Sequence, residues 1–178
     1  VINNGPRPVA AETRSRVEQV IKKLGYYPNE FARNLRRQNS LTIGLIFPSI
    51  ANTVHAEIAE GLDSVCVDNG YELLILDSHF DMKREKRLIH LLRSKQVNGV
   101  VIQPLQDAKS LLEPLQDARI PIVLIQDDVP NVHSISLSDF EGGILAIKHL
   151  LELGHQHIAM IKAKPFRVLS YERFEGYK

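Results

Sequence analysis

The sequence predicts a doubly wound α/β domain built on a parallel sheet, preceded by a short all-helical segment. From Leu41 onward, runs of valine, isoleucine and leucine alternate with amphipathic segments, which is typical of successive βαβ units. These runs are nearly continuous in hydrophobicity, so the strands are expected to be buried on both faces and flanked by helices. The first 40 residues contain no such run, and their hydrophobic residues recur with helical spacing.

The N-terminal segment is expected to hold two helices. The first runs from about Ala10 to Leu24 and ends at Gly25, a residue type that favours the left-handed conformation after a helix. Its hydrophobic residues share one face: Val17, Val20, Ile21 and Leu24. Asn29 can cap a second helix over residues 29–37, which combines a thin hydrophobic stripe with several arginines and is too short to be stable alone in water.

Six strands and four helices are expected in the α/β domain. The strands are Thr42–Phe47, Tyr71–Leu76, Gly99–Gln103, Ile122–Gln126, Ser134–Leu137 and Ile158–Lys162. The helices are Val54–Asn69, Met82–Lys95, Ala108–Ala118 and Phe140–Leu153, the third of them bent by Pro114. Right-handed crossovers make such a sheet doubly wound, and its ligands bind at the carboxyl ends of the strands. Those ends are Pro48–Thr53, Asp77–Phe80, Pro104–Asp107 and Gln126–Val129.

The net charge of +1 hides an uneven distribution along the 178 residues. Residues 1–40 contain eight basic and three acidic residues, a net charge of +5, and the remaining 138 residues carry a net charge of −4. A basic segment joined to a mildly acidic domain indicates a polyanionic partner at one end only.

The composition favours a protein of the cytoplasm. The single cysteine, Cys66, has no second cysteine in the chain with which to pair, and residues 1–30 lack the pattern of a secretory signal. The longest hydrophobic runs fall far short of the ~20 residues that a membrane helix requires. The chain begins at Val1 rather than at methionine, so we expect its natural N-terminus to lie further upstream.

The common motifs that carry enzyme chemistry are absent from the sequence. There is no G-x-G-x-x-G, G-x-x-x-x-G-K-[ST], H-E-x-x-H or G-x-S-x-G, so neither a catalytic residue nor a cofactor is predicted. His149, His155 and His157 straddle a helix end and the start of a strand, and this spacing predicts no metal site. Asp127 and Asp128 follow a buried strand; one carboxylate faces the strand-end crevice, or both belong to a solvated turn.

The short basic helix over residues 29–37 is a candidate DNA-binding element. Leu35 stands among Arg33, Arg36 and Arg37. Minor-groove binders use this combination, because arginines screen the phosphates while a hydrophobic wedge unstacks a base step. The alternative for such a charge run is a solvated helix face.

The chain resembles the LacI/GalR family of bacterial transcriptional regulators over nearly its whole length. The motifs that carry the resemblance follow one another in the family's order and spacing. They are Val1-Ile-Asn3, Thr13-Arg14-x-x-Val17, Leu24-Gly25-Tyr26-x-Pro28-Asn29, Ala32-Arg33-x-Leu35, Ile43-Gly44-Leu-Ile46, Gly70-Tyr71, Val97-x-Gly99-Val-Val-Ile102, Ile120-Pro121-Ile-Val-Leu124-Ile125, His149-Leu-x-x-Leu153-Gly154-His155-x-x-Ile158 and Arg173-x-x-Gly176-Tyr177.

The resemblance implies roles for individual residues. The positions expected at operator DNA are Asn3, Thr13, Asn29, Ala32, Arg33, Leu35 and Arg36. Leu35 would be an intercalating wedge paired with its twin in a homodimer. The positions expected in an effector cleft between two subdomains are Val54, His55, Gln126, Asp127, Arg167 and Arg173. The guanidinium of Arg173 suits the hydroxyls or carboxylate of a small ligand.

The resemblance also sets expected boundaries. Residues 1–28 correspond to the C-terminal part of a helix-turn-helix headpiece and residues 29–40 to a hinge helix and linker. Residues 41–155 correspond to the N-terminal effector-binding subdomain of a periplasmic-binding-protein-like fold, and residues 156–178 to the start of the C-terminal one. The chain is therefore expected to be a fragment that lacks the start of the headpiece and most of the second subdomain.

Four positions depart from the family pattern. The family commonly has aromatic residues at Val54 and His55 and an aspartate at Gln126, which argues against a typical platform for stacking a sugar. Ala10 replaces the usual serine N-cap, a change that costs a helix about 1 kcal/mol.

The expected function is a sequence-specific DNA-binding transcriptional regulator, a repressor controlled by a sugar, sugar phosphate or purine-like effector. Two alternatives remain. One is a sugar-binding receptor of the periplasmic-binding-protein type that does not bind DNA, and the other is a small α/β enzyme with its chemistry near Asp127 and Arg173.

Overall fold

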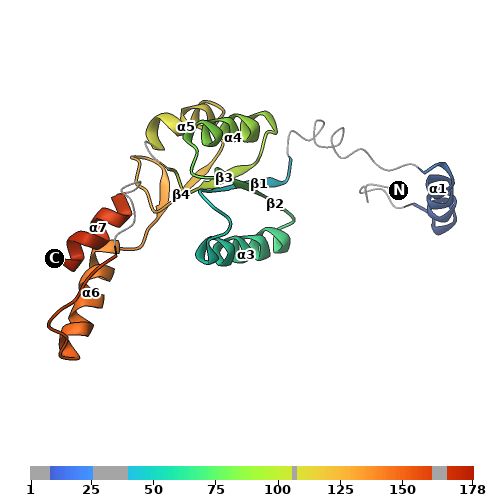
Figure 1. Ribbon diagram of the computed structural model, residues 1–178. Helices are drawn as coiled ribbons and strands as arrows, with labels where there is room; N and C mark the ends of the chain where they lie inside the picture. Colours follow the sequence, from blue (N-terminus) through green and yellow to red (C-terminus); the bar gives the residue numbers. More distant parts are fainter. Residues whose placement is uncertain (1–8, 26–39, 106–107, 162–167) are drawn as a thin grey trace. The chain divides into compact units, whose positions relative to one another are not determined.

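The computed structural model describes residues 9–25, 40–105, 108–161 and 168–178 (Figure 1). The chain divides into two compact units, Val1–Gln38 and Asn39–Lys178. In the described part of the first unit, helix α1 spans Ala11–Leu24 and ends at Gly25, whose φ of 60° is left-handed as predicted. Ala10 makes no side-chain cap. The helix predicted over residues 29–37 lies outside the described residues.

The second unit is built on a five-stranded parallel sheet with the strand order β2-β1-β3-β4-β5. The strands are β1 (Thr42–Phe47), β2 (Glu72–Asp77), β3 (Gly99–Ile102), β4 (Ile122–Ile125) and β5 (His133–Ile135). Strand β1 lies between β2 and β3, so the chain places β2 on one side of β1 and then crosses to place β3 on its other side. The predicted doubly wound parallel sheet is thus confirmed.

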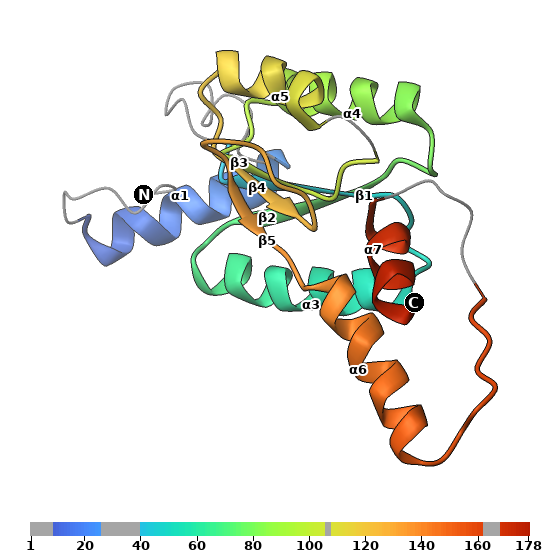
Figure 2. The ribbon, with the colours of Figure 1, turned by 90° about the vertical axis from the view of Figure 1, so that its left-hand side faces the viewer.

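Helices cover both faces of the sheet (Figures 1 and 2). The helices of this unit are α3 (Thr53–Asp68), α4 (Met82–Ser94), α5 (Ala108–Asp117), α6 (Asp139–Glu152) and α7 (Val168–Tyr177). The first three flank the sheet, while α6 and α7 pack against each other. Helices α4 and α5 lie on one face, where Ile89, Leu92 and Leu112 pack against Ile46 and Ile102. Helix α3 lies on the other face, where Ala59 packs with Phe47 and Leu45. No helix among the described residues is long and apolar enough to cross a membrane.

One predicted strand is wrong, and one helix was not predicted. The described residues of the expected strand Ile158–Lys162 form no regular structure, and the side chain of Ile161 is fully exposed. A strand needs a neighbour for its backbone groups, and no described segment pairs with this one. Helix α7 was missed because its ten residues show only a weak hydrophobic face.

The N-cap of α4 gives a pH-dependent prediction. The Asp81 carboxylate accepts hydrogen bonds from the backbone N–H groups of Lys83, at 2.7 Å, and Arg84, at 3.2 Å. These N–H groups, that of Arg84 most strongly, hold the pKa of Asp81 below its usual value. The stabilisation is therefore complete above the pKa of the unfolded chain and is lost as the pH falls through the lowered folded pKa.

Replacing the Asp81 carboxylate with an amide tests the direction of this pH dependence of stability. Asp81→Asn keeps an N-cap acceptor that does not titrate, so the variant should lose less stability than the wild type between pH 7 and pH 3. Urea unfolding at both pH values measures the difference. Asp128→Asn is the control, because Asp128 is an exposed carboxylate that caps no helix. An equal acid loss in Asp81→Asn and the wild type would contradict the prediction.

Candidate functional site

The carboxyl ends of β1 and β2 are joined by a set of hydrogen bonds around Asp77. One carboxylate oxygen of Asp77 accepts the N–H of Ile50 at 3.1 Å, and the other accepts the N–H of His79 at 2.6 Å. His79 and Phe80 have φ angles of 52° and 55°, a left-handed conformation that non-glycine residues rarely adopt. Such backbone is held in place by its surroundings and is commonly found at binding sites.

Two glutamines meet where β3 and β4 end. Gln103 Nε2 donates a hydrogen bond to Gln126 Oε1. The Gln103 side chain is only 2% exposed, and its Oε1 has no partner among the described residues. Gln126 has a left-handed φ of 55°. The buried hydroxyl of Ser78, directly after β2, also lacks a partner among these residues. The strand ends therefore hold buried polar groups whose hydrogen-bonding capacity is not fully used.

Helix α3 begins shortly after β1, and its first turn exposes Val54 to solvent but buries His55. Asn52 caps the helix by accepting the N–H of Val54, whose side chain is 57% exposed. His55 is buried and stacks on the ring of Phe47, with ring centroids 4.4 Å apart. Its Nδ1 lies 2.6 Å from the carbonyl oxygen of Ser49, so Nδ1 carries the hydrogen and donates it. These contacts fix the imidazole in one orientation.

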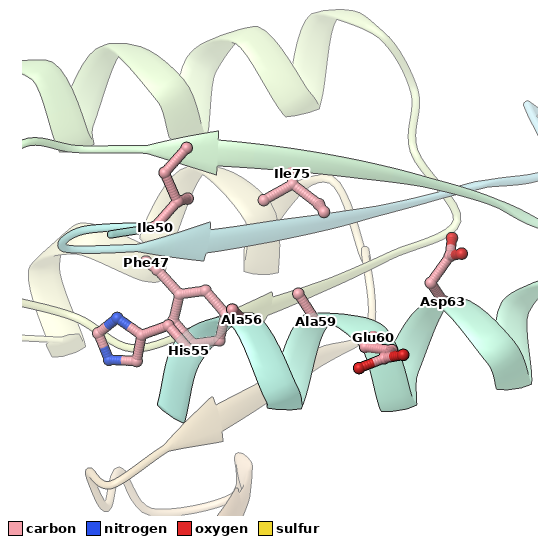
Figure 3. A pocket seen from close by; sticks show the side chains of 8 residues that line it. All are labelled: Phe47, Ile50, His55, Ala56, Ala59, Glu60, Asp63 and Ile75. Atoms are coloured by element: carbon pink, nitrogen blue, oxygen red, sulfur yellow. The ribbon is translucent and has the colours of Figure 1, made fainter. Parts of the chain in front are cut away.

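A cavity of about 420 Å³ lies between α3 and the strands β1 and β2 (Figure 3). Its lining residues are Phe47, Ile50, His55, Ala56, Ala59, Glu60, Asp63 and Ile75. Figure 3 shows the His55–Phe47 pair at one end and Asp63 at the other, along one side of α3. The cavity is mainly hydrophobic and lies beside β2, which is the edge strand of the sheet.

Arg173 is held by a buried carboxylate. From α7, its Nε donates to Asp139 Oδ1 at 2.8 Å, and its Nη2 donates to the same oxygen. Asp139 is 6% exposed at the first turn of α6, while the side chain of Arg173 is 57% exposed. The other oxygen, Asp139 Oδ2, has no partner among the described residues. The pair leaves guanidinium N–H groups of Arg173 directed to solvent in a fixed orientation.

The structure brings some of the predicted effector residues into defined contacts and leaves others apart. Gln126 pairs with Gln103, His55 with Phe47, and Arg173 with Asp139. Asp127 is half-buried and accepts the N–H of the exposed Asp128, which fits a turn. Arg167 lies outside the described residues.

The DNA-binding predictions fall mostly outside the described part of the chain. Thr13 lies on α1 and is exposed. The positions outside are Asn3, Asn29, Ala32, Arg33, Leu35 and Arg36. His149, His155 and His157 are exposed, and no group of three or more residues that could hold a metal ion occurs among the described residues.

Several residues of the candidate site were missed from the sequence. Gln103 ends a hydrophobic strand, and its place beside Gln126 requires the strand order, which puts β3 next to β4. Ser78 and Asp139 carry no motif. Glu85 sits among the cations of α4, yet it is 2% exposed and accepts the N–H of Leu105. A polar residue on the hydrophobic face of an amphipathic helix was the one available signal for Glu85.

The comparison with protein families places this fold in one class. The chain matches the family described as periplasmic binding proteins and sugar binding domain of LacI family over residues 40–178. Among curated relatives, the HTH-type transcriptional repressor PurR of Aliivibrio fischeri is 32% identical, over 98% of this chain and 53% of the relative. The HTH-type transcriptional regulator DegA of Bacillus subtilis is 31% identical, over 100% and 54%.

Solved structures agree with these relatives. The Lac repressor bound to ONPG is 26% identical, with a TM-score of 0.80 over 99% of this chain and 54% of the repressor. The Cra transcriptional dual regulator of Pseudomonas putida in complex with fructose 1-phosphate is 27% identical, with a TM-score of 0.69 over 77% and 52%. The protein belongs to the LacI family of periplasmic-binding-protein-like domains, and the chain spans about half the length of the relatives it matches.

Proposed function

We propose that this chain is part of a cytoplasmic transcriptional repressor that binds DNA through its N-terminal segment and a small-molecule effector at the strand ends. The observation that carries the proposal is the set of underused polar groups where the strands end, above all the Gln103–Gln126 pair, in a domain of the LacI family. The basic N-terminal residues support the DNA-binding part. The boundaries predicted at residues 28, 40 and 155 remain part of this proposal.

The effector site would be formed by Val54, Gln103, Gln126, Asp127 and Arg173. The hydrogen bond between the two amides uses one N–H of Gln103 and one lone pair of Gln126 Oε1. Further N–H groups on both amides and the oxygen of Gln103 remain available, which suits a neutral ligand bearing hydroxyl or amide groups. Arg173, oriented by Asp139, would add further donors. Sugars, sugar phosphates and purine-like molecules remain the candidate classes. His55 would act indirectly in this site, because its ring is committed to Phe47 and Ser49.

A homodimer is part of the proposal, because two hinge segments would have to meet on one operator. The cavity beside α3 adjoins the edge strand β2, and its lining includes the exposed hydrophobic residues Ile50 and Ile75. A second copy packed against this face would cover these side chains and the edge of the sheet.

Fluorescence anisotropy with a labelled duplex tests the function. We expect duplex binding that weakens about 100-fold between 50 and 200 mM salt, as about four phosphate contacts require. Thermal shift against sugars, sugar phosphates and nucleobases should identify a ligand that stabilises the protein and also changes its affinity for the duplex. Absence of duplex binding at 50 mM salt would contradict the proposal and favour a receptor. Consumption of the stabilising ligand would favour an enzyme.

A further inference from the structure

Helix α4 carries a concentration of cations that the proposed function does not use. Residues 82–95 include six lysines and arginines and one acidic residue, Glu85. The acidic side chain is buried on the sheet side of the helix together with Leu88, Ile89 and Leu92. This local excess of positive charge stands out in a domain whose total charge is negative.

The cations form a line along one side of the helix. Lys83, Lys86, Arg87, His90 and Arg93 follow one another at i, i+3, i+4, i+7 and i+10, and all five are exposed. We call this set the basic stripe. It extends over about 15 Å at 1.5 Å per residue, opposite the buried face of α4.

The basic stripe is only partly balanced by the carboxylates of the described residues. Of the described carboxylates, none forms an ion pair with a residue of the stripe. The Asp81 carboxylate attracts Lys83 and Arg87, but it also accepts the N–H groups at the helix N-terminus. Arg84, beside the stripe, donates from Nε to the backbone oxygen of Asp77. Long cationic side chains are thus held close together, where their mutual repulsion is relieved by an external anion.

The chemistry of the basic stripe fits a nucleic acid partner better than a protein partner. Protein interfaces are depleted in lysine at their centre and need a hydrophobic core, whereas protein–DNA interfaces are polar and strongly positive. Leu91 is the exposed large hydrophobic residue within the span of the stripe. Duplex DNA presents about one charge per 1.7 Å of its axis, so a 15 Å line of cations can face several phosphates.

The position of α4 in the domain supports the same partner. The helix ends at Ser94 and leads to Asn98, whose side-chain oxygen accepts hydrogen bonds from Ser40 Oγ, at 3.1 Å, and the Thr42 N–H, at 3.3 Å. Ser40 follows directly on the basic N-terminal segment in the sequence. The Arg93 end of the stripe therefore lies at the end of the domain where that segment joins.

The opposite face of the sheet has the opposite charge. Helix α3 contains Glu57, Glu60, Asp63 and Asp68 and no lysine or arginine. Because α3 and α4 cover different faces of the sheet (Figure 1), the domain has a basic helix on one face and an acidic helix on the other. A polyanion would be attracted by the α4 side and repelled by the α3 side.

We propose that the basic stripe of α4 binds the phosphate backbone of duplex DNA, as a second contact surface outside the N-terminal segment. The proposal rests on the proposed DNA binding and extends it to the sheet domain. The stripe contributes affinity and salt dependence without reading sequence, because it offers cations to phosphates and has no element suited to enter a groove.

The test compares two variants of the full chain that carry the same change in charge. Lys86→Glu with Arg93→Glu reverses two cations of the stripe, and Lys109→Glu with Lys148→Glu reverses two exposed cations on α5 and α6. The probe is a labelled 30-base-pair duplex, and anisotropy is recorded from 50 to 300 mM salt. We expect the stripe variant to lose about 2 from the slope of log K against log salt, at about 0.9 for each phosphate contact, while the control keeps the slope of the wild type.

The outcomes separate this inference from the proposed function. Equal slopes for the stripe variant and the control would overturn the inference while leaving DNA binding intact. Absence of duplex binding by the wild type would overturn both. A stripe variant that changes self-association in sedimentation, with an unchanged DNA slope, would show that the stripe contacts a second copy of the chain and would also overturn the inference. Lys86→Gln with Arg93→Gln repeats the comparison should the reversals disturb folding.

Discussion

Replacing Gly176 with valine should separate α7 from α6. A Cβ atom at Gly176 would lie 2.1 Å from the backbone oxygen of Phe140 and 3.0 Å from the backbone nitrogen of Ile144. Both atoms belong to the α6 backbone, which cannot yield as a flexible side chain would. Overpacking of a close contact costs about 1–3 kcal/mol, and here the obstructing backbone places the expected loss at the upper end of that range. Arg173, which α7 carries, should then lose its fixed position at Asp139.

Hydrogen exchange resolved by peptide measures this effect. The valine variant should lose amide protection in α6 and α7 while β1 and β3 remain protected. Gly142→Ala provides the control, because Gly142 lies on α6 next to Gly143, and a Cβ there meets no atom within 4 Å. That substitution should stabilise α6 by about 0.5–1 kcal/mol. Unchanged protection of α7 in the valine variant would show that the two helices do not depend on this contact.

The sheet could be predicted because its signal is local. Each strand of the parallel sheet is a short hydrophobic run, so residues such as Ile43–Phe47 identify β1 without reference to any neighbour. Helix α7 lacks such a signal. Its position depends on Gly176 fitting against Gly143 of α6, a contact between glycines 33 residues apart that hydrophobic periodicity does not reveal.

The candidate site was only partly predictable, since its contacts join residues far apart in the sequence. The resemblance to the family pointed to Gln126 and Arg173, but their partners Gln103 and Asp139 come from other elements. For His55 the resemblance indicated the position of the residue but not the orientation of its ring. The ring turns onto Phe47, a residue that the sequence marked only as part of a buried strand.

The distribution of charge over the surface could also be predicted only in part from the sequence. Counting residues along the chain separated a basic N-terminal segment from an acidic domain. It could not show that the cation-rich helix α4 and the acidic helix α3 lie on opposite faces of the sheet, because this requires the folded arrangement of the two helices. A negative total charge is therefore compatible with a surface that attracts DNA.

Replacing Glu85 with alanine should loosen the loop that carries Gln103. Glu85 Oε1 accepts the backbone N–H of Leu105 at 3.0 Å in a buried position, which ties α4 to the loop after β3. Alanine removes the acceptor, leaves a buried N–H without this bond and opens a void. Together these effects should cost about 2–4 kcal/mol of the free energy of unfolding. Since Gln103 lies two residues before Leu105, effector binding at the strand ends should weaken as well.

Glutamine at the same position separates the hydrogen bond from the charge. Glu85→Gln keeps an oxygen that can accept the Leu105 N–H, so its loss of stability should stay below about 1 kcal/mol. Urea unfolding of both variants measures the difference, and titration with a ligand found by thermal shift reports the state of the loop. Equal losses in the two variants would contradict the argument, because a carboxylate charge and not the bond to Leu105 would then hold α4 against the loop. The unequal result would identify Glu85 as the residue through which a helix on the basic side of the domain supports the candidate effector site.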